Sequence, residues 1–524
     1  MFSDIGFLRD LIHRPFLGTL NFFVIYFLSH LARMYFVSST CWTDTWKTIV
    51  LLLGKWCAMR PLFSFIKLCV CLLMLLPLSQ NLHAATQLDS KGTDFWLMFE
   101  GNVNTPTLTL FIAGDTATIG TVSIPGLSFT SSFSVTPGTV TSVILPSTAQ
   151  VTTSNTIGNL GIHVSSAAEV TVYGLNRARY TTDAFLGLPA DILGTEYINL
   201  GYGRSGSQFG IVATQANTTV TITPSVTTGS RIVGVPYSII LNQGQTYQLR
   251  NTTSTGDLTG SIVQSDKPIA AFGGHQCANI PPGYTACDHI VEQLTPTNTW
   301  GQTFLTVPLA TRLKGDTFRI LASQNGTEVR INGSLVATLN RGKFYEQIIV
   351  GQSEIITTKP VLVAQYSNGT AFDGVTSDPF ETLIPPNEQF LANYTVTTPA
   401  SGFLINYINI VAPNAMVGAI NLDGSPIPSA SFLPIGSSGF SGTAVPVTIG
   451  SHNLDGSLPF GLTVYGFALY DSYGYPGGLA LGQVASLSSL TISPKIATSP
   501  INTDHCVAAT TKDQNSKALP GIRM

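Results

Sequence analysis

The segment IHVSSAAEVTVYGLN (162–176) decides the fold, because three more segments of the chain end in the same way. They are SIVQSDKPIAAFGGH (261–275), EIITTKPVLVAQYSN (354–368) and, more loosely, DGSLPFGLTVYGFAL (455–469). Each contains a short polar turn, a hydrophobic strand and an aromatic residue followed by Gly or Ser. The aromatic markers stand 99, 94 and 99 residues apart, at Tyr173, Phe272, Tyr366 and Tyr465. Repetition at this period predicts about four structural units.

The residues between these endings are typical of β-strands. Alternating runs such as NTTVTITP (217–224) and FYEQIIV (344–350) are rich in β-branched and aromatic residues and end at Gly, Pro or Asn. Hairpin turns, which need positive φ and therefore favour Gly, are expected at Gly138, Gly244, Gly342 and Gly436. We expect an all-β fold of about four tandem β-sandwich-like repeats, each about 95–100 residues long, with a β-propeller as the alternative.

The chain is expected to divide into four segments. They are a hydrophobic N-terminal extension at 1–58, a signal peptide at 59–85, a β-repeat region at 86–483, and a linker or truncated Ig-like domain at 484–524. The β-repeat region is expected to divide into units at about 92–180, 181–280, 281–390 and 391–483. A hydrophobic signal or anchor helix would therefore precede the repeats.

The N-terminus indicates export. The segment MRPLFSFIKLCVCLLMLLPLSQNLHAATQ (59–87) has basic residues, an apolar run at 68–78 and a small-residue end, which is the layout of a signal peptide. Its apolar run is too short to span a bilayer, which needs about 20 residues. A second apolar stretch at 16–37 is interpreted as an extension upstream of the true start, with a membrane anchor as the alternative. We expect a secreted or cell-surface protein, membrane-tethered if that anchor is real.

Charge is scarce in this chain. Only 10% of residues are charged, against roughly 25% in typical proteins, and the net charge is −3. The chain has no Lys/Arg-rich run or basic stripe, so nucleic acid is not expected as a partner. Uncharged polar residues must therefore cover much of the surface, as is common in extracellular β proteins.

Three cysteines, Cys277, Cys287 and Cys506, follow the predicted cleavage site. In an exported chain, Cys277 and Cys287 are expected to form a disulfide that closes the loop CANIPPGYTAC. The alternative is a zinc site, because His275 and His289 flank the pair and complete a set of four ligands.

The chain has no G-x-S-x-G, H-E-x-x-H or P-loop pattern, so we expect neither enzymatic activity nor a cofactor. The acidic residues of AFDGVTSDPFE (371–381) are interpreted as a solvated turn, with a calcium site at Asp373, Asp378 and Glu381 as the alternative. The best candidate for a ligand surface is a cluster of tyrosines, since Tyr provides contact area at low entropy cost. The cluster comprises Tyr465, Tyr470, Tyr473 and Tyr475, and packing within the last unit is the alternative.

Several motifs together resemble the N-terminal domain of the IgG-Fc-binding protein family. They are GTDFWLMF (92–99), SDKP (265–268), CDHIVEQLTPTNTWGQTF (287–304) and YGYPGG (473–478), and the resemblance covers about residues 88–483. It implies an extracellular, non-enzymatic module associated with adhesion or mucus, and it supports the Cys277–Cys287 bridge. The low cysteine count resembles a bacterial member of the family. Residues 488–524 resemble the first strands of bacterial Ig-like domains of invasin type.

The function expected from these observations is binding or adhesion outside the cell. The partner would be an extracellular protein or a glycan, such as a host or mucus glycoprotein. A structural stalk or matrix element without a specific ligand is the alternative.

Overall fold

The computed structural model describes residues 88–481, 489–493 and 508–512. These residues form strands and short helical turns, which confirms the all-β prediction. One compact unit spans Ala85–Ser486. The helical turns are η2 (Pro125–Leu127), η3 (Ser147–Ala149), η4 (Ala190–Ile192), η5 (Thr297–Thr299), η6 (Asn387–Gln389), η7 (Asn414–Met416), η8 (Ser429–Ser431) and α4 (Thr370–Asp373).

The first sheet is built around one long strand, β7 (Ile162–Ala178). The other members are β1 (Gly92–Leu97), β2 (Thr107–Ala113), β3 (Thr118–Ile124), β4 (Phe129–Val135), β5 (Thr141–Leu145) and β8 (Thr181–Gly187). The N-terminal half of β7 pairs with β1 and β3, whereas its C-terminal half pairs with β2 and β8. The sheet therefore curls, and β7 runs through both of its halves.

Three further sheets repeat this order around long strands that carry the other copies of the repeated segment. The second sheet comprises β9 (Gly194–Ile198), β10 (Ser207–Ala213), β11 (Thr218–Thr223), β12 (Tyr237–Leu241), β13 (Thr246–Arg250), β14 (Ile262–Ala278) and β15 (Asp288–Gln293). It also includes β6 (Thr156–Gly158), which comes from the chain between β5 and β7 and pairs with β13. The pairing of β6 with β13 therefore connects the first repeat to the second.

The third and fourth sheets complete the set. The third comprises β16 (Gly301–Thr306), β17 (Asp316–Ala322), β18 (Thr327–Ile331), β19 (Ser334–Leu339), β20 (Phe344–Ile349), β21 (Ser353–Tyr366) and β22 (Glu381–Leu383). The fourth comprises β23 (Leu391–Thr397), β24 (Ile405–Pro413), β25 (Asn421–Leu422), β26 (Ser425–Pro426), β27 (Leu433–Pro434), β28 (Phe440–Val447), β29 (Ser451–Ala468) and β30 (Asp471–Pro476).

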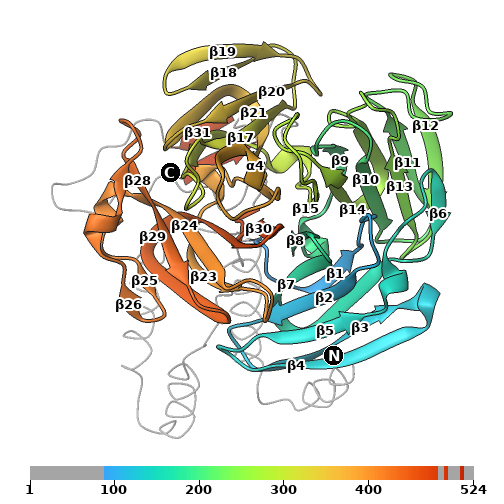
Figure 1. The fold of residues 1–524 in the computed structure, drawn as a ribbon, viewed down its shortest axis with the longest axis horizontal. Helices are drawn as coiled ribbons and strands as arrows, with labels where there is room; N and C mark the ends of the chain where they lie inside the picture. Colours follow the sequence, from blue (N-terminus) through green and yellow to red (C-terminus); the bar gives the residue numbers. More distant parts are fainter. Residues whose placement is uncertain (1–87, 482–488, 494–507, 513–524) are drawn as a thin grey trace, which may run out of the picture. The chain divides into compact units, whose positions relative to one another are not determined.

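The four sheets surround a common centre (Figure 1). At this centre β8 contacts β15, β15 contacts β22, β22 contacts β30, and β30 contacts β8. The ring is closed at its ends, because Ser90 N donates to Leu479 O at 2.9 Å and Leu481 N donates to Leu88 O at 2.8 Å. The tandem sandwich arrangement is therefore not confirmed, and the propeller alternative describes this ring better.

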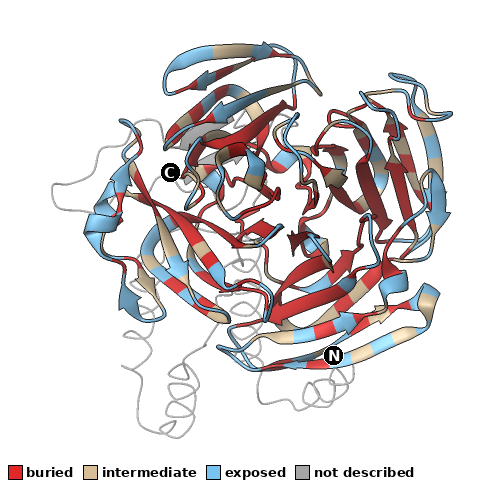
Figure 2. Cartoon of the chain, viewed as in Figure 1, coloured by how far each residue is buried: buried red, intermediate tan, exposed pale blue. Residues whose placement is uncertain are grey.

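Burial follows the same geometry. The inner strands are buried, whereas outer strands such as β4, β12 and β19 consist mainly of exposed and partly exposed residues (Figure 2). In β7 the first four residues alternate between buried and partly exposed, residues 166–169 are partly or fully exposed, and the C-terminal half is almost continuously buried. A strand covered on one face alternates, and a strand covered on both faces does not. The continuously buried run VTVYGL (170–175) thus lies where a neighbouring sheet packs against β7.

All four expected glycines adopt positive φ, as predicted, but only Gly436 lies between paired strands, β27 and β28. The turns at Gly138, Gly244 and Gly342 join strands that do not pair with each other and are not hairpins. The φ values are 76° at Gly138, 73° at Gly244, 75° at Gly342 and 51° at Gly436. The repeat boundaries differ from those expected. The first sheet ends at Gly187 and the second at Gln293, beyond the expected limits at 180 and 280, because the inner strand of each repeat follows its long strand.

One carboxylate at the centre connects all four inner strands. Asp183 Oδ1 accepts backbone N–H groups of Ala184 on β8 at 2.8 Å and Gly474 on β30 at 3.2 Å. Its Oδ2 accepts those of Val291 on β15 at 3.0 Å and Glu381 on β22 at 3.1 Å. The Asp183 side chain is fully buried. Four donors that would otherwise be buried without partners are therefore satisfied by a single side chain.

The ends of the chain add little to the described fold. The strands β31 (Ser489–Ser493) and β32 (Ala508–Lys512) pair antiparallel. The expected extension at 1–58, the signal peptide at 59–85 and most of 484–524 lie outside the described residues. Within the described residues, no helix has the length and apolarity that crossing a membrane requires.

Replacing Asp183 by Asn is expected to destabilise the ring. The amide keeps one acceptor oxygen, but its NH₂ group would face two backbone N–H donors. Each buried donor left without a partner costs about 1–3 kcal/mol, so the free energy of unfolding should fall by about 2–6 kcal/mol in urea denaturation. As a control, Asp191→Asn at an exposed site on η4 should change stability by less than about 0.5 kcal/mol. Equal effects of the two substitutions would contradict the role of Asp183.

Candidate functional site

The predicted tyrosine surface is wrong, because three of the four side chains are buried. Tyr465, Tyr473 and Tyr475 are at most 1% exposed. Their hydroxyls are used internally, since Tyr465 donates to Asn409 Oδ1 and the other two donate to fourth-sheet oxygens. The alternative interpretation was packing within the last unit, and these rings pack both within the fourth sheet and against its neighbours. Only Tyr470 lies at the surface, where it is 45% exposed.

Tyr470 lies beside a groove between the first and fourth sheets. The groove has a volume of about 760 Å³, and its floor is one face of the first sheet. The floor comprises Thr107, Thr109 and Phe111 of β2, Ser142 and Ile144 of β5, and Leu175 and Arg177 of β7. Residues 400–402 and the turn between β29 and β30 form the opposite wall.

Strand alternation explains the floor. Successive side chains of β2 point to opposite faces, so the three groove residues at 107, 109 and 111 share a face. The residues between them, Leu108 and Leu110, are fully buried on the other face. The register places Thr109 opposite Ile144 on one side and opposite Leu175 on the other. The floor of the groove therefore consists of rows of side chains that run across the strands.

Arg177 joins the floor to the wall. Its guanidinium lies over the Phe403 ring, 5.4 Å from the centroid, and Nη1 donates to Ser401 O at 3.3 Å. Its Nε lies 3.8 Å from Asp471 Oδ2. At Gly402, where φ is +96°, a Cβ atom would come within 2.2 Å of Arg177 Nη2. The positive φ favours glycine at this position, and the absence of a side chain leaves room for the guanidinium.

Two tyrosines in equivalent turns form the rim of the groove. Tyr180 lies between β7 and β8, and Tyr470 lies between β29 and β30. Both adopt positive φ, and their rings meet edge to face at 6.2 Å. Arg179 lies over the Tyr180 ring at 4.8 Å. Sequence reasoning missed Tyr180, although its place after a repeated long strand matches that of Tyr470.

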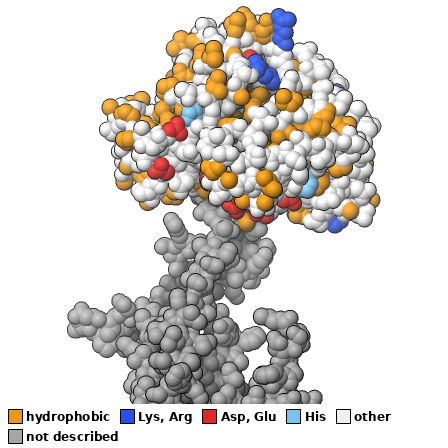
Figure 3. All heavy atoms as spheres, turned by 90° about the horizontal axis from the view of Figure 1, so that it is seen from below, with side chains coloured by type: hydrophobic (Ala, Val, Ile, Leu, Met, Phe, Trp, Pro, Cys, Tyr) orange, Lys and Arg blue, Asp and Glu red, His pale blue; other side chains and the backbone are white. Residues whose placement is uncertain are grey.

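The groove and its surroundings also expose large apolar side chains. Ile144 is 67% exposed, Leu469 is 65% exposed, and Leu404, which follows the wall, is 86% exposed. Apolar side chains that gather at a concave surface mark an interaction site. Uncharged polar and apolar side chains cover most of the face that Figure 3 presents. This observation agrees with the expected uncharged polar surface.

The groove is equipped for binding. Its lining among the described residues offers hydroxyls, two guanidinium groups and aromatic rings, and Asp471 is its only carboxylate. Neither histidine nor cysteine lines it in the described part of the chain.

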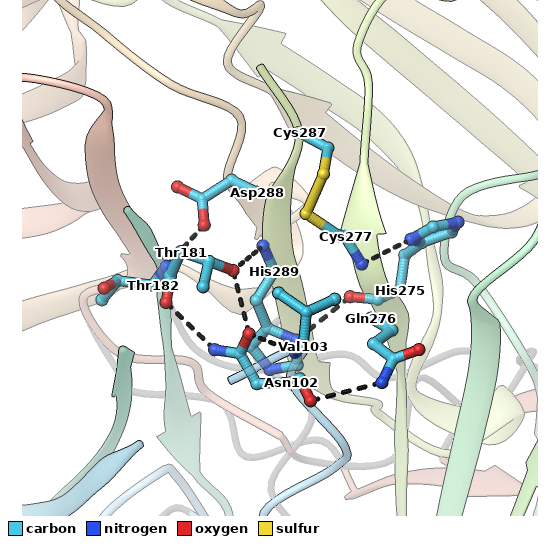
Figure 4. The surroundings of a disulfide bond; sticks show 10 residues. All are labelled: Asn102, Val103, Thr181, Thr182, His275, Gln276, Cys277, Cys287, Asp288 and His289. Atoms are coloured by element: carbon cyan, nitrogen blue, oxygen red, sulfur yellow. Dashed lines mark hydrogen bonds between the residues drawn. A yellow bond between two sulfur atoms is a disulfide. The ribbon is translucent and has the colours of Figure 1, made fainter. Parts of the chain in front are cut away.

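The Cys277–Cys287 disulfide is confirmed (Figure 4). The flanking histidines are bound within the fold, because His275 Nδ1 accepts Cys277 N at 2.9 Å and His289 Nδ1 donates to His275 O at 3.0 Å. Burial lowers the pKa of His275 to about 4 and that of His289 to about 3, so both rings are neutral at physiological pH. The sulfurs are bonded to each other, and no metal-binding set of His, Cys, Asp or Glu occurs among the described residues.

The acidic residues of the alternative calcium site are held by separate partners. Asp373 Oδ1 lies 2.8 Å from Arg312 Nη2, and both side chains are fully buried. Glu381 accepts a hydrogen bond from the Tyr366 hydroxyl at 2.9 Å. Asp378 is buried with carboxylates of neighbouring strands, and burial raises its pKa to about 8. They therefore do not form the solvated turn that the sequence suggested.

Other buried carboxyl groups lie near the centre of the ring. Burial raises the pKa of Glu100 to about 8, although the positive charge of Arg250 opposes this shift. Burial also raises the pKa of Asp471 to about 6. Burial raises the pKa of Asp183 as well, and its four backbone N–H donors oppose the shift. Glu100 therefore retains its proton near pH 7, where exposed carboxyls have lost theirs.

A family model described as IgGFc binding protein matches residues 183–466. A human protein named IgGFc-binding protein is 28% identical to this chain over 278 residues, which cover 50% of this chain and 5% of the human protein. The chain thus spans about a twentieth of the length of this relative. The matched residues include the second and third sheets, whereas the floor of the groove precedes them.

Loss of the disulfide is expected to weaken the fold without abolishing it. The double substitution Cys277→Ser and Cys287→Ser should lower the free energy of unfolding by about 2–3 kcal/mol, because the reduced loop gains entropy in the unfolded chain. Urea denaturation gives this difference. Intact mass of the unmodified chain should show the loss of the two thiol hydrogens, and a free thiol at either position would contradict the bridge.

Stability is expected to fall as the pH rises from 5 to 8. The folded pKa of Glu100, about 8, lies above the usual Glu value near 4.3, so the folded chain holds a proton that the unfolded chain releases. The free energy of unfolding should therefore fall by about 2–4 kcal/mol over this range through Glu100 alone. Glu100→Gln should remove that part of the pH dependence, whereas Glu169→Gln at an exposed site should not. A dependence on pH that Glu100→Gln leaves unchanged would refute this assignment.

Proposed function

This chain belongs to the IgGFc-binding protein family, and from that premise we propose that it is an extracellular, non-enzymatic binding module that holds its ligand in the groove between the first and fourth sheets. The single observation that carries the proposal is the groove itself. It combines a volume of about 760 Å³ with exposed apolar, aromatic and cationic side chains. Such a combination provides contact area, orientation and specificity for a ligand.

Ring closure supports this assignment. The wall and the floor come from opposite ends of the β-repeat region, yet Tyr173 OH donates to Thr395 O and Gly477 O at 3.3 Å. The Tyr173 and Tyr475 rings lie 4.5 Å apart directly beside the groove. A site that is held on both sides by buried contacts loses little entropy when a ligand binds.

The class of ligand is an extracellular protein or glycan. The name of the human relative refers to binding of IgG Fc, which makes IgG Fc one candidate for this chain. The matched region supplies the scaffold but not the floor of the groove, so the ligand is expected to depend on residues particular to the first sheet. The module is proposed to be secreted or displayed at the cell surface, with the signal peptide at 59–85 as the export signal.

The experiment uses the full chain against a panel of IgG Fc, mucin glycoproteins and immobilised glycans. We expect saturable binding to at least one member of the panel. Ile144→Glu introduces a charge into the groove and should weaken this binding by about tenfold or more. Ile240→Glu is the matched control, because Ile240 is 61% exposed on the outer strand β12 of the second sheet.

Two results would contradict the proposal. Equal loss of binding in both variants would show that the ligand does not bind in the groove. No binding across the panel would favour a structural stalk or matrix element.

A further inference from the structure

We propose that the groove recognises an oligosaccharide that carries a carboxylate, such as one ending in a sialic acid. The inference rests on the proposed binding function and assigns the chemical class of its ligand. It is drawn from the side chains that the first and fourth sheets bring together, and each kind of side chain matches one part of such a sugar.

Over β2 and β7 the floor is a sheet face, so a ligand there meets side chains and not free backbone groups. Strand β5, on the other side of β2, is the last strand of the sheet. Strand β2, in the middle of the floor, is paired with β5 on one side and β7 on the other. A peptide that adds to a sheet as an extra strand needs an unpaired strand edge. A ligand over β2 and β7 must instead be recognised by the hydroxyls, rings and guanidinium groups that project from the floor.

The hydroxyls of the floor suit a polyhydroxylated ligand. Thr107 and Thr109 of β2 and Ser142 of β5 line the groove, and Thr105 lies just before β2. A Ser or Thr hydroxyl both donates and accepts hydrogen bonds, and it rotates to suit its partner. Sugar hydroxyls have the same dual character, so neighbouring hydroxyls on protein and sugar can satisfy each other.

The charge of the groove favours an anion. Two guanidinium groups, of Arg177 and Arg179, face a single carboxylate, that of Asp471. Asp471 lies at the limit of an ion pair with Arg177. Arg179 is exposed, and it has no carboxylate within ion-pair distance among the described residues. An arginine fork matches the two oxygens of a carboxylate, so the free cation of the groove fits a sugar acid.

The rim offers two exposed rings for the apolar face of a sugar. Tyr180 is 52% exposed and Tyr470 is 45% exposed, and their edge-to-face contact fixes them next to Arg179. Tyrosine combines an apolar face with a polar tip and loses little entropy on binding. A sugar ring packed against this pair would place an acidic substituent within reach of the guanidinium.

The test compares sialyllactose with lactose as ligands of the full chain, measured by isothermal titration or by ligand-observed NMR. We expect sialyllactose to bind about tenfold or more tightly than lactose, because only the sialic acid supplies a carboxylate. Arg179→Gln should weaken the binding of sialyllactose about tenfold and leave the binding of lactose unchanged. The matched control is Arg330→Gln, since Arg330 is a 45% exposed arginine of the third sheet.

Several results would overturn this assignment. Equal affinity for sialyllactose and lactose would remove the role of the carboxylate, and preference for a sulfated oligosaccharide would assign the groove to another anion. If the chain bound IgG Fc or deglycosylated mucin through the groove but neither sugar, the assignment to a glycan would fail while the binding function would stand. Circular dichroism of each variant would show that the fold is retained, so loss of binding could not be attributed to unfolding.

Discussion

The whole ring depends on the carboxylate of Asp183. Backbone N–H groups of Ala184, Gly474, Val291 and Glu381 converge on its two oxygens, one group from the inner strand of each sheet. The inner strands meet at the centre of the ring, where a buried N–H group needs an acceptor from another part of the chain. One aspartate supplies that acceptor to four strands, and it thereby fixes their positions relative to one another.

Closure of the ring creates the groove. Residues at opposite ends of the β-repeat region become neighbours because the segment near Ser90 pairs with the segment near Leu479. Arg177 then reaches Ser401, and Tyr180 reaches Tyr470. The ligand site is consequently a property of the closed ring, and neither the first nor the fourth sheet contains it alone.

The chain uses its few charges unevenly. Several carboxyl groups lie at the centre, where burial raises the pKa of Asp288, Glu292 and Glu381 well above the usual range. The exposed strands are covered mainly by hydroxyl, amide and apolar groups. On such a surface the two arginines at the groove can attract an anionic ligand effectively, because few other positive charges compete for it.

The sequence by itself determined the local structure. Alternation in strands such as β2 and β11, the positive φ of Gly138, Gly244 and Gly342, the fourfold repetition and the Cys277–Cys287 bridge follow from short-range rules of sterics, side-chain period and redox chemistry. The alternation and the turns depend on residues that are close in the chain, and the bridge depends on which cysteines the chain contains.

Only the tertiary structure decided which faces are covered. Tyr465, Tyr473 and Tyr475 follow one another at short intervals like a surface cluster, yet neighbouring sheets bury all three, while Tyr470 stays exposed because it occupies a turn. The same holds for Asp183, an ordinary residue of TTDAFLG in the sequence, whose four partners are brought to it by closure of the ring. Periodicity defines the faces of a strand, but the element that packs against each face is set by contacts between residues hundreds of positions apart.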